Sequence, residues 1–165
     1  MKIAIGTDHG GVGLKEEMKK FLSGSGYEII DFGTHTTESC DYPVFAYKVA
    51  KAVSDKKADF GLLICKSGNG MAIVANKLPG VRAAMCYDRN VAVLSRQHND
   101  ANILVLGSEH LFDEPEVIVR AWLGANFEGG RHKRRVDQIT DIEKKMCAIA
   151  PKKSNVVKKK KRAKK

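Results

Sequence analysis

The sequence lacks long apolar segments and clustered cysteines. Its apolar runs, such as residues 61–65, are far too short to cross a bilayer. The first residues also lack the apolar stretch of a secretory signal and are typical of a strand, so we expect a cytoplasmic protein. The four cysteines, Cys40, Cys65, Cys86 and Cys147, form no CxxC motif and no zinc-spaced pair with histidine. We therefore expect free thiols in a reducing compartment.

Two phosphate-binding motifs of nucleotide proteins are also missing. Residues 6–11 (GTDHGG) do not fit GxGxxG, which disfavours a dinucleotide. Residues 65–70 (CKSGNG) do not end in Gly-Lys-Ser/Thr, and their lysine precedes the glycines, so they are not a P-loop.

The excess of positive charge is confined to one end of the chain. The 165 residues contain 29 Lys+Arg and 19 Asp+Glu, for a net charge of +10. Residues 151–165 hold nine of the basic side chains and no acid, which leaves 20 basic and 19 acidic side chains in residues 1–150. We expect one domain at 1–150 and a disordered basic tail at 151–165, either a solubilising extension or a weak, salt-dependent contact for nucleic acid.

Short β-rich segments alternate with amphipathic segments of helical length. The pattern predicts strands at 2–6, 27–32, 59–65, 81–86 and 102–106, and helices at 12–22, from about Pro43, and at 68–78, 88–96, 115–123 and 131–148. Such alternation predicts a doubly wound, three-layer α/β/α domain (Rossmann-like) with a five-stranded parallel sheet and a C-terminal helix. In these folds ligands bind beyond the carboxyl ends of the strands.

The loop after the third predicted strand is the first candidate site. Cys65 ends an apolar strand, and glycines lead from it into a helix whose positive end attracts anions. The same field predicts a lowered pKa for Cys65, which would make it a base or nucleophile. A buried cysteine beside a structural turn is an equally good interpretation of this segment alone.

Three more polar segments are candidates, each with a structural alternative. Asp8 and His9 follow the first strand, where they could contact hydroxyls and phosphate, or serve as a helix cap and a turn. Residues 95–102 (SRQHNDAN) form a dense polar run, or a solvated helix end. Arg131 and Arg135 share one helix face and could clamp a phosphate, or belong to a solvated basic face.

Taken together, these segments resemble the type B ribose-5-phosphate isomerase family, which includes galactose- and allose-6-phosphate isomerases. The similarity extends from Ile3 to about Glu143. Its matched segments are 6–11, 33–34, 41–43, 63–65, 67–70, 75–77, 94–100 and 129–132 with Arg135.

The resemblance implies an aldose–ketose isomerisation through an enediolate. It assigns Cys65 as the base, His98 as the ring-opening residue, and Ser67 with Asn99 as the anion hole. The remaining substrate-binding residues it implies are Asp8, His9, Asp41, Tyr42, Gly68, Asn69, Gly70, Arg131 and Arg135. Among these, His9, Arg131 and Arg135 are expected to hold the phosphate.

The resemblance also implies no metal or organic cofactor, and a homodimer or dimer of dimers with the site between subunits. A hexose 6-phosphate isomerase and a noncatalytic phosphosugar-binding protein remain alternatives. Ser67 stands where threonine is frequent, which keeps the hydroxyl. Glu109 stands where relatives often have an arginine, and it would repel phosphate unless it points away or pairs with Arg131 or Arg135.

Overall fold

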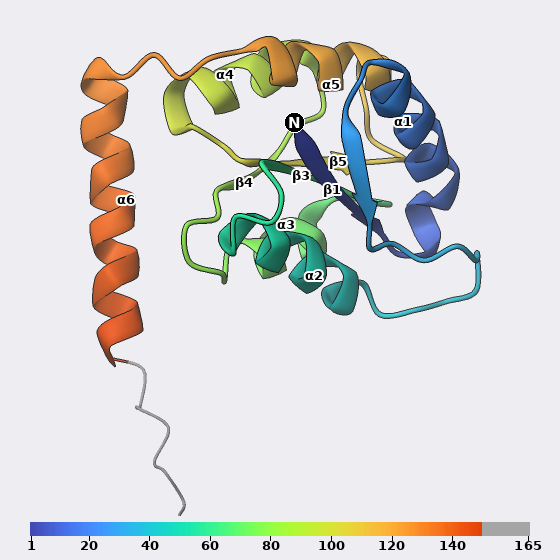
Figure 1. Ribbon diagram of the computed structural model, residues 1–165, viewed down its shortest axis with the longest axis horizontal. Helices are drawn as coiled ribbons and strands as arrows, with labels where there is room; N and C mark the ends of the chain where they lie inside the picture. Colours follow the sequence, from blue (N-terminus) through green and yellow to red (C-terminus); the bar gives the residue numbers. More distant parts are fainter. Residues whose placement is uncertain (150–165) are drawn as a thin grey trace, which may run out of the picture.

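A computed structural model describes residues 1–149, which form a parallel sheet with helices on both faces (Figure 1). The strands are β1 (Lys2–Thr7), β2 (Glu28–Asp31), β3 (Phe60–Cys65), β4 (Ala83–Met85) and β5 (Ile103–Gly107). The helices are η1 (His9–Gly11), α1 (Val12–Gly24), α2 (Tyr42–Ser54), α3 (Asn69–Ala75), α4 (Arg89–Asn99), α5 (Pro115–Gly124) and α6 (Gly130–Ile149). Within this part of the chain, no helix combines the length and apolarity needed to cross a membrane. The predicted tail at 151–165 lies outside the described residues.

The predicted five-stranded α/β architecture is confirmed, with shifts at the ends of several elements. The helix predicted at 68–78 ends at Ala75, because the side chain of Asn76 exchanges hydrogen bonds with the backbone of Ala83 (2.8 and 2.9 Å). The helix predicted to end at residue 96 continues to Asn99 and stops at Asp100, whose φ is 47°. Side-chain hydrogen bonds and left-handed residues set these ends, and apolar periodicity does not report them.

The strand order reverses between β1 and β3, the place where folds of this kind form a ligand-binding crevice. The order is β2-β1-β3-β5-β4, so the chain builds outward from β1 on one side and then crosses to the other. Loops that leave neighbouring strands in opposite directions at such a reversal open a space for ligands at the carboxyl edge. Asp8 and Cys65 follow or end these two strands.

Apolar side chains cover both faces of the sheet. Along β3, Leu62 and Ile64 face the core under α1, α4 and α5, while Leu63 and Cys65 face the core under α2 and α3. Figure 1 shows these two groups of helices on opposite sides of the sheet, with α6 at one side of the body, where its first turn contacts α4. Cys65 is therefore fixed at the end of a fully packed strand.

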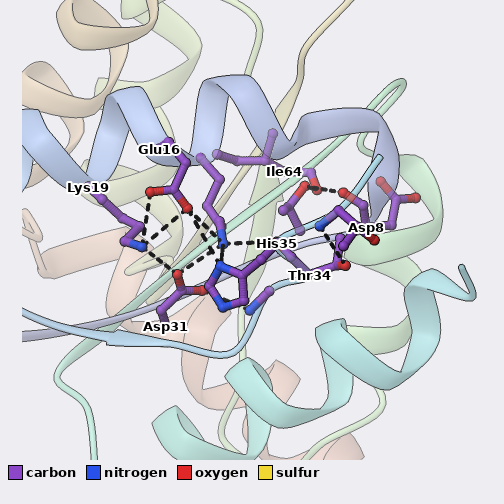
Figure 2. A network of polar contacts seen from close by, with 11 residues as sticks. Asp8, Glu16, Lys19, Asp31, Thr34, His35 and Ile64 are labelled. Atoms are coloured by element: carbon purple, nitrogen blue, oxygen red, sulfur yellow. Dashed lines mark hydrogen bonds and ion pairs between the residues drawn. The ribbon is translucent and has the colours of Figure 1, made fainter. Parts of the chain in front are cut away.

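A buried lysine of α1 holds the loop after β2, within a polar network in which Figure 2 labels Lys19, Asp31 and Thr34. The Lys15 side chain has no exposed surface, and its Nζ lies 2.9 Å from both Asp31 Oδ2 and the carbonyl oxygen of Thr34. Lys19 Nζ lies 2.7 Å from the same Asp31 oxygen. The Thr34 N–H then donates to the carbonyl oxygen of Thr7 (3.1 Å), directly before Asp8. This network therefore stabilises the end of β1, which Asp8 follows directly.

Replacing Asp31 with asparagine is expected to lower the free energy of unfolding by about 3 kcal/mol at pH 7, because it leaves the buried Lys15 ammonium with only the more exposed carboxylate of Glu16. Burial alone raises the pKa of Asp31, but hydrogen bonds from Lys19 and Lys15 bring it below its ordinary value. The stabilisation is therefore present above the unfolded pKa and is lost as pH falls through the lower folded value.

Urea unfolding of wild type and Asp31→Asn, at one protein concentration and at several pH values, measures this difference. The control is Asp55→Asn, which removes the exposed Lys51–Asp55 pair and should leave stability almost unchanged. An Asp31→Asn protein as stable as the control at pH 7 would contradict the role of the network.

Candidate active site

The first group of predicted site residues lies at the carboxyl edge of β1 and β3. Thr7 pairs with Ile64 in the parallel register, so Asp8 and Cys65 lie opposite each other at the strand ends. Asp8 is only 8% exposed, and its Oδ1 accepts a hydrogen bond from the Gly10 N–H (2.9 Å). A carboxylate and a thiol thus share one edge of the crevice.

The loop after Cys65 folds back onto the thiol. Gly68 has φ +81°, a left-handed conformation that glycine adopts without strain, and its N–H donates to Cys65 Sγ at 3.1 Å. A Cβ at Gly107 would lie 2.8 Å from the Ser67 carbonyl oxygen, so the loop after β5 holds this turn closely. The Gly68 N–H is therefore placed to stabilise a negative charge on the Cys65 sulfur.

The sequence-based prediction of a lowered Cys65 pKa is wrong for this structure. Burial raises the pKa of the thiol above its ordinary value, the Gly68 N–H offsets part of this, and the Asp8 carboxylate adds to it. Cys65 is only 6% exposed, and the helix that follows it, α3, has only 7 residues. Burial therefore affects the pKa of the thiol more than the positive end of this helix does. In the single chain, the surroundings of Cys65 therefore favour the protonated thiol over the thiolate.

Asp41, Tyr42 and His9 complete the carboxyl-edge group. Asp41 is the N-cap of α2, and the Tyr42 ring lies so close to Gly70 that a Cβ there would be 2.6 Å from it. His9 Nδ1 accepts a hydrogen bond from the Cys40 N–H (3.2 Å), so in the neutral ring the proton is on Nε2. These residues therefore lie on the loops and helix starts at the same edge of the sheet as Cys65.

The second group of predicted residues lies at the opposite edge of the sheet. Helix α4 leaves the carboxyl end of β4 and returns to the amino end of β5, so His98 and Asn99 lie at the amino edge. Arg82, the residue before β4, confirms this placement by donating from Nε to the Asn99 carbonyl oxygen at 3.0 Å.

At the amino edge, His98 is joined to the start of α6. Its ring stacks on that of His132 with centroids 4.1 Å apart and planes 4° from parallel. Arg131 Nε donates to His132 Nε2 (3.3 Å), and Glu128 Oε2 lies 3.9 Å from His98 Nε2. Burial, together with His98 and Arg131, lowers the pKa of His132. Arg131 and Arg135 are exposed beside this stack.

The donor atoms of His98, Glu128 and His132 lie within 4.8 Å of one another, a spacing that a metal ion could bridge. The hydrogen bond from Arg131 already occupies His132 Nε2 and brings a positive charge next to it. The stack is therefore better suited to orienting Arg131 and His98 than to holding a cation.

A single chain does not assemble the predicted site. The two groups are separated by the length of the strands, roughly 15–20 Å for five or six residues. His9 on one edge and Arg131 with Arg135 on the other cannot hold one phosphate within one chain. Glu109 does not pair with either arginine in this chain; its Oε1 lies 3.6 Å from Lys66 Nζ.

Three residues around the site were missed by sequence reasoning. Lys15 was not singled out, although its spacing to Met18 and Leu22 puts all three on the buried stripe of α1. His132 appeared only within the matched segment 129–132, and Lys66 only as the lysine that precedes the glycines of residues 65–70. For Lys15 and His132, a basic side chain at a buried position of a helix was the signal that could have found them.

The chain is similar to known sugar-phosphate isomerases over most of its length. Residues 3–139 match the family described as Ribose/Galactose Isomerase. Ribose-5-phosphate isomerase B of Escherichia coli (strain K12) is 49% identical over 145 residues, covering 87% of this chain and 97% of the relative. The putative sugar phosphate isomerase YwlF of Bacillus subtilis (strain 168) is 42% identical over 147 residues, covering 88% and 99%.

The chain is also similar to solved structures of ribose-5-phosphate isomerase B. Ribose-5-phosphate isomerase B of Clostridium thermocellum superposes with a TM-score of 0.86 and 54% identity, covering 88% of this chain and 99% of that one. Ribose-5-phosphate isomerase B of Mycoplasma genitalium, solved with bound ribulose-5-phosphate, superposes with a TM-score of 0.83 and 42% identity, covering 87% and 96%.

Proposed function

The chain belongs to the ribose/galactose isomerase family, and from this membership we propose that it interconverts ribose 5-phosphate and ribulose 5-phosphate. The observation that carries the proposal is the similarity, over nearly the whole of both chains, to proteins named ribose-5-phosphate isomerase B. The relatives whose names specify a sugar favour the pentose over allose or galactose 6-phosphate.

Cys65 is proposed as the base that moves a proton between C2 and C1. Its place at the end of β3 and its contact with the Gly68 N–H support this role. The N–H that donates a hydrogen bond to the sulfur can stabilise the thiolate. Ser67 and the N–H groups of Gly68, Asn69 and Gly70 would stabilise the enediolate oxygen, with Asn99 of a second chain.

The remaining roles follow from charge and hydrogen-bonding capacity. His98 is proposed to open the sugar ring, since an imidazole has two ring nitrogens and can both give and take a proton. His9 with Arg131 and Arg135 would bind the phosphate. The sugar hydroxyls would be bound by Asp8, Asp41 and Tyr42. No step in this scheme requires a metal or an organic cofactor.

A homodimer, or a dimer of such dimers, is proposed as the active form, with each site built from two chains. Two observations support it. The carboxyl-edge and amino-edge groups are too far apart to act on one sugar within a chain. In addition, α6 leaves a groove of about 610 Å³ beside the body of the chain, lined by apolar side chains that include Leu78, Pro79, Ile139, Ile142 and Met146. A second chain could fill it.

Turnover of a panel of aldose phosphates tests the proposed function. We expect kcat/KM for ribose 5-phosphate to exceed that for allose 6-phosphate and galactose 6-phosphate by at least about tenfold, because a site fitted to five carbons must distort to accept a longer sugar. Preference for either hexose phosphate would reassign the substrate. Binding of these sugars without any turnover would indicate the noncatalytic phosphosugar-binding protein instead.

A further inference from the structure

We propose that Lys66, held by Glu109, is a substrate-binding residue that contacts the phosphate of the sugar phosphate. It would give the Cys65 half of the site a permanent positive charge of its own. The inference rests on the proposed isomerase function for the identity of the substrate, but it concerns a contact that can be measured with phosphate alone.

Three loops fix the position of Lys66 at the carboxyl edge. Its carbonyl oxygen accepts a hydrogen bond from the Glu109 N–H (3.2 Å), next to the bond from the Ser108 N–H to the Cys65 carbonyl oxygen (2.9 Å). The Ser108 hydroxyl donates to the carbonyl oxygen of Gly10 (3.0 Å). The loops that follow β1, β3 and β5 thus meet around this residue.

The Lys66 side chain lies across Gly10, beside His9. A Cβ at Gly10 would be 2.6 Å from Lys66 Cγ, so the methylene stem occupies the space that a larger residue would fill. The stem therefore lies against the loop that carries His9. A sugar phosphate whose reacting carbons lie at Cys65 can extend its phosphate toward the same loop.

The charge of this edge favours such a cation. Asp8, Asp41 and Glu109 place three carboxylates on the loops at the carboxyl edge, where the Lys66 ammonium lies beside Glu109. Lys66 Nζ lies 3.6 Å from Glu109 Oε1, which compensates the acid that would otherwise repel a phosphate dianion.

The Lys66–Glu109 pair is loose enough to admit a ligand. Its N···O distance exceeds the 2.7–2.9 Å of a strong charge-assisted hydrogen bond, and the two side chains are 62% and 56% exposed. Exposed pairs of this kind contribute little to stability, so the ammonium can turn to a phosphate oxygen while Glu109 keeps it near the site.

Substitutions at the pair test the assignment through KM. Lys66→Met is expected to raise KM for ribose 5-phosphate and the inhibition constant of inorganic phosphate about tenfold, with kcat largely kept, because it removes one charge-assisted contact to the phosphate. Lys66→Arg should stay close to wild type, and Glu109→Gln should lower both constants. Lys2→Met is the matched control, since it removes the lysine of another exposed ion pair, at the amino ends of β1 and β2.

Unchanged KM and phosphate inhibition in Lys66→Met, with an active wild type, would overturn the proposal. So would a fall in kcat at constant KM, because a phosphate contact made equally in the ground and transition states affects binding. If the wild type isomerises no sugar phosphate, calorimetric titration with inorganic phosphate decides. If Lys66→Met then binds inorganic phosphate more weakly than Lys2→Met does, the phosphate contact is supported. In that case only the proposed isomerase function has failed.

Discussion

Replacing Cys65 with alanine is expected to lower kcat/KM for ribose 5-phosphate by a factor of about 10²–10⁴, the contribution of a positioned proton-transfer group. The loss should fall mainly on kcat, because the thiol acts on the C–H bond and the phosphate contacts lie elsewhere. Steady-state kinetics at saturating sugar phosphate measures it. Because Cys65 is buried, removing its sulfur should also lower the free energy of unfolding by about 1 kcal/mol, which is too little to unfold the variant.

Cys86→Ala is the matched control for this variant. Cys86 is also buried, with a pKa raised to about 11, but it belongs to the core on the other face of the sheet. Its loss should leave kcat/KM close to wild type. Near wild-type turnover by Cys65→Ala, with Cys86→Ala equally active, would eliminate Cys65 as the base.

The raised pKa of Cys65 gives the same prediction a pH dependence. If the thiolate is the reactive form and its pKa lies above the ordinary value, the fraction of active base in the free protein increases as pH rises toward that pKa. Wild-type kcat/KM should therefore keep rising above pH 8, until other groups titrate. The residual activity of Cys65→Ala should lack this rise.

The fold was predictable because apolar periodicity alternates regularly between strand and helix. Every predicted strand is present, and Leu62 to Cys65 pack on both faces as a parallel strand should. The order of the strands was not predictable in the same way, because β5 inserts between β3 and β4 through contacts distant in sequence. The element ends at Asn76 and Asp100 depend on single hydrogen bonds and one left-handed residue.

Candidate site residues and a site between subunits could be named from the sequence through the resemblance, but not which of these residues lie at which edge of the sheet. His98 and Asn99 end a helix that precedes a strand, which places them at the amino edge, whereas Asp8 and Cys65 follow strands. The pKa of Cys65 depends on the balance of burial, Asp8 and the Gly68 N–H, and a sequence motif does not report burial. The pairing of Glu109 with Lys66 likewise depends on how three loops meet.

Two inactive variants of this chain are expected to restore each other when combined. One carries Cys65→Ala and the other carries His98→Ala together with Arg135→Ala, so each has only one functional half of the site. In a two-fold dimer with sites between chains, the mixed pair regains one complete site, formed by Cys65 of one chain and the amino-edge residues of the other. The other site of the same pair lacks both halves.

Isolating that mixed dimer with two different affinity tags tests the central claim most directly. The account predicts about half of the wild-type kcat per dimer, because one of two equivalent sites is intact. A tagged pair in which both chains carry Cys65→Ala is the control and should remain inactive. Mixed dimers no more active than their parents, beside a fully active wild-type tagged pair, would contradict a site shared between chains.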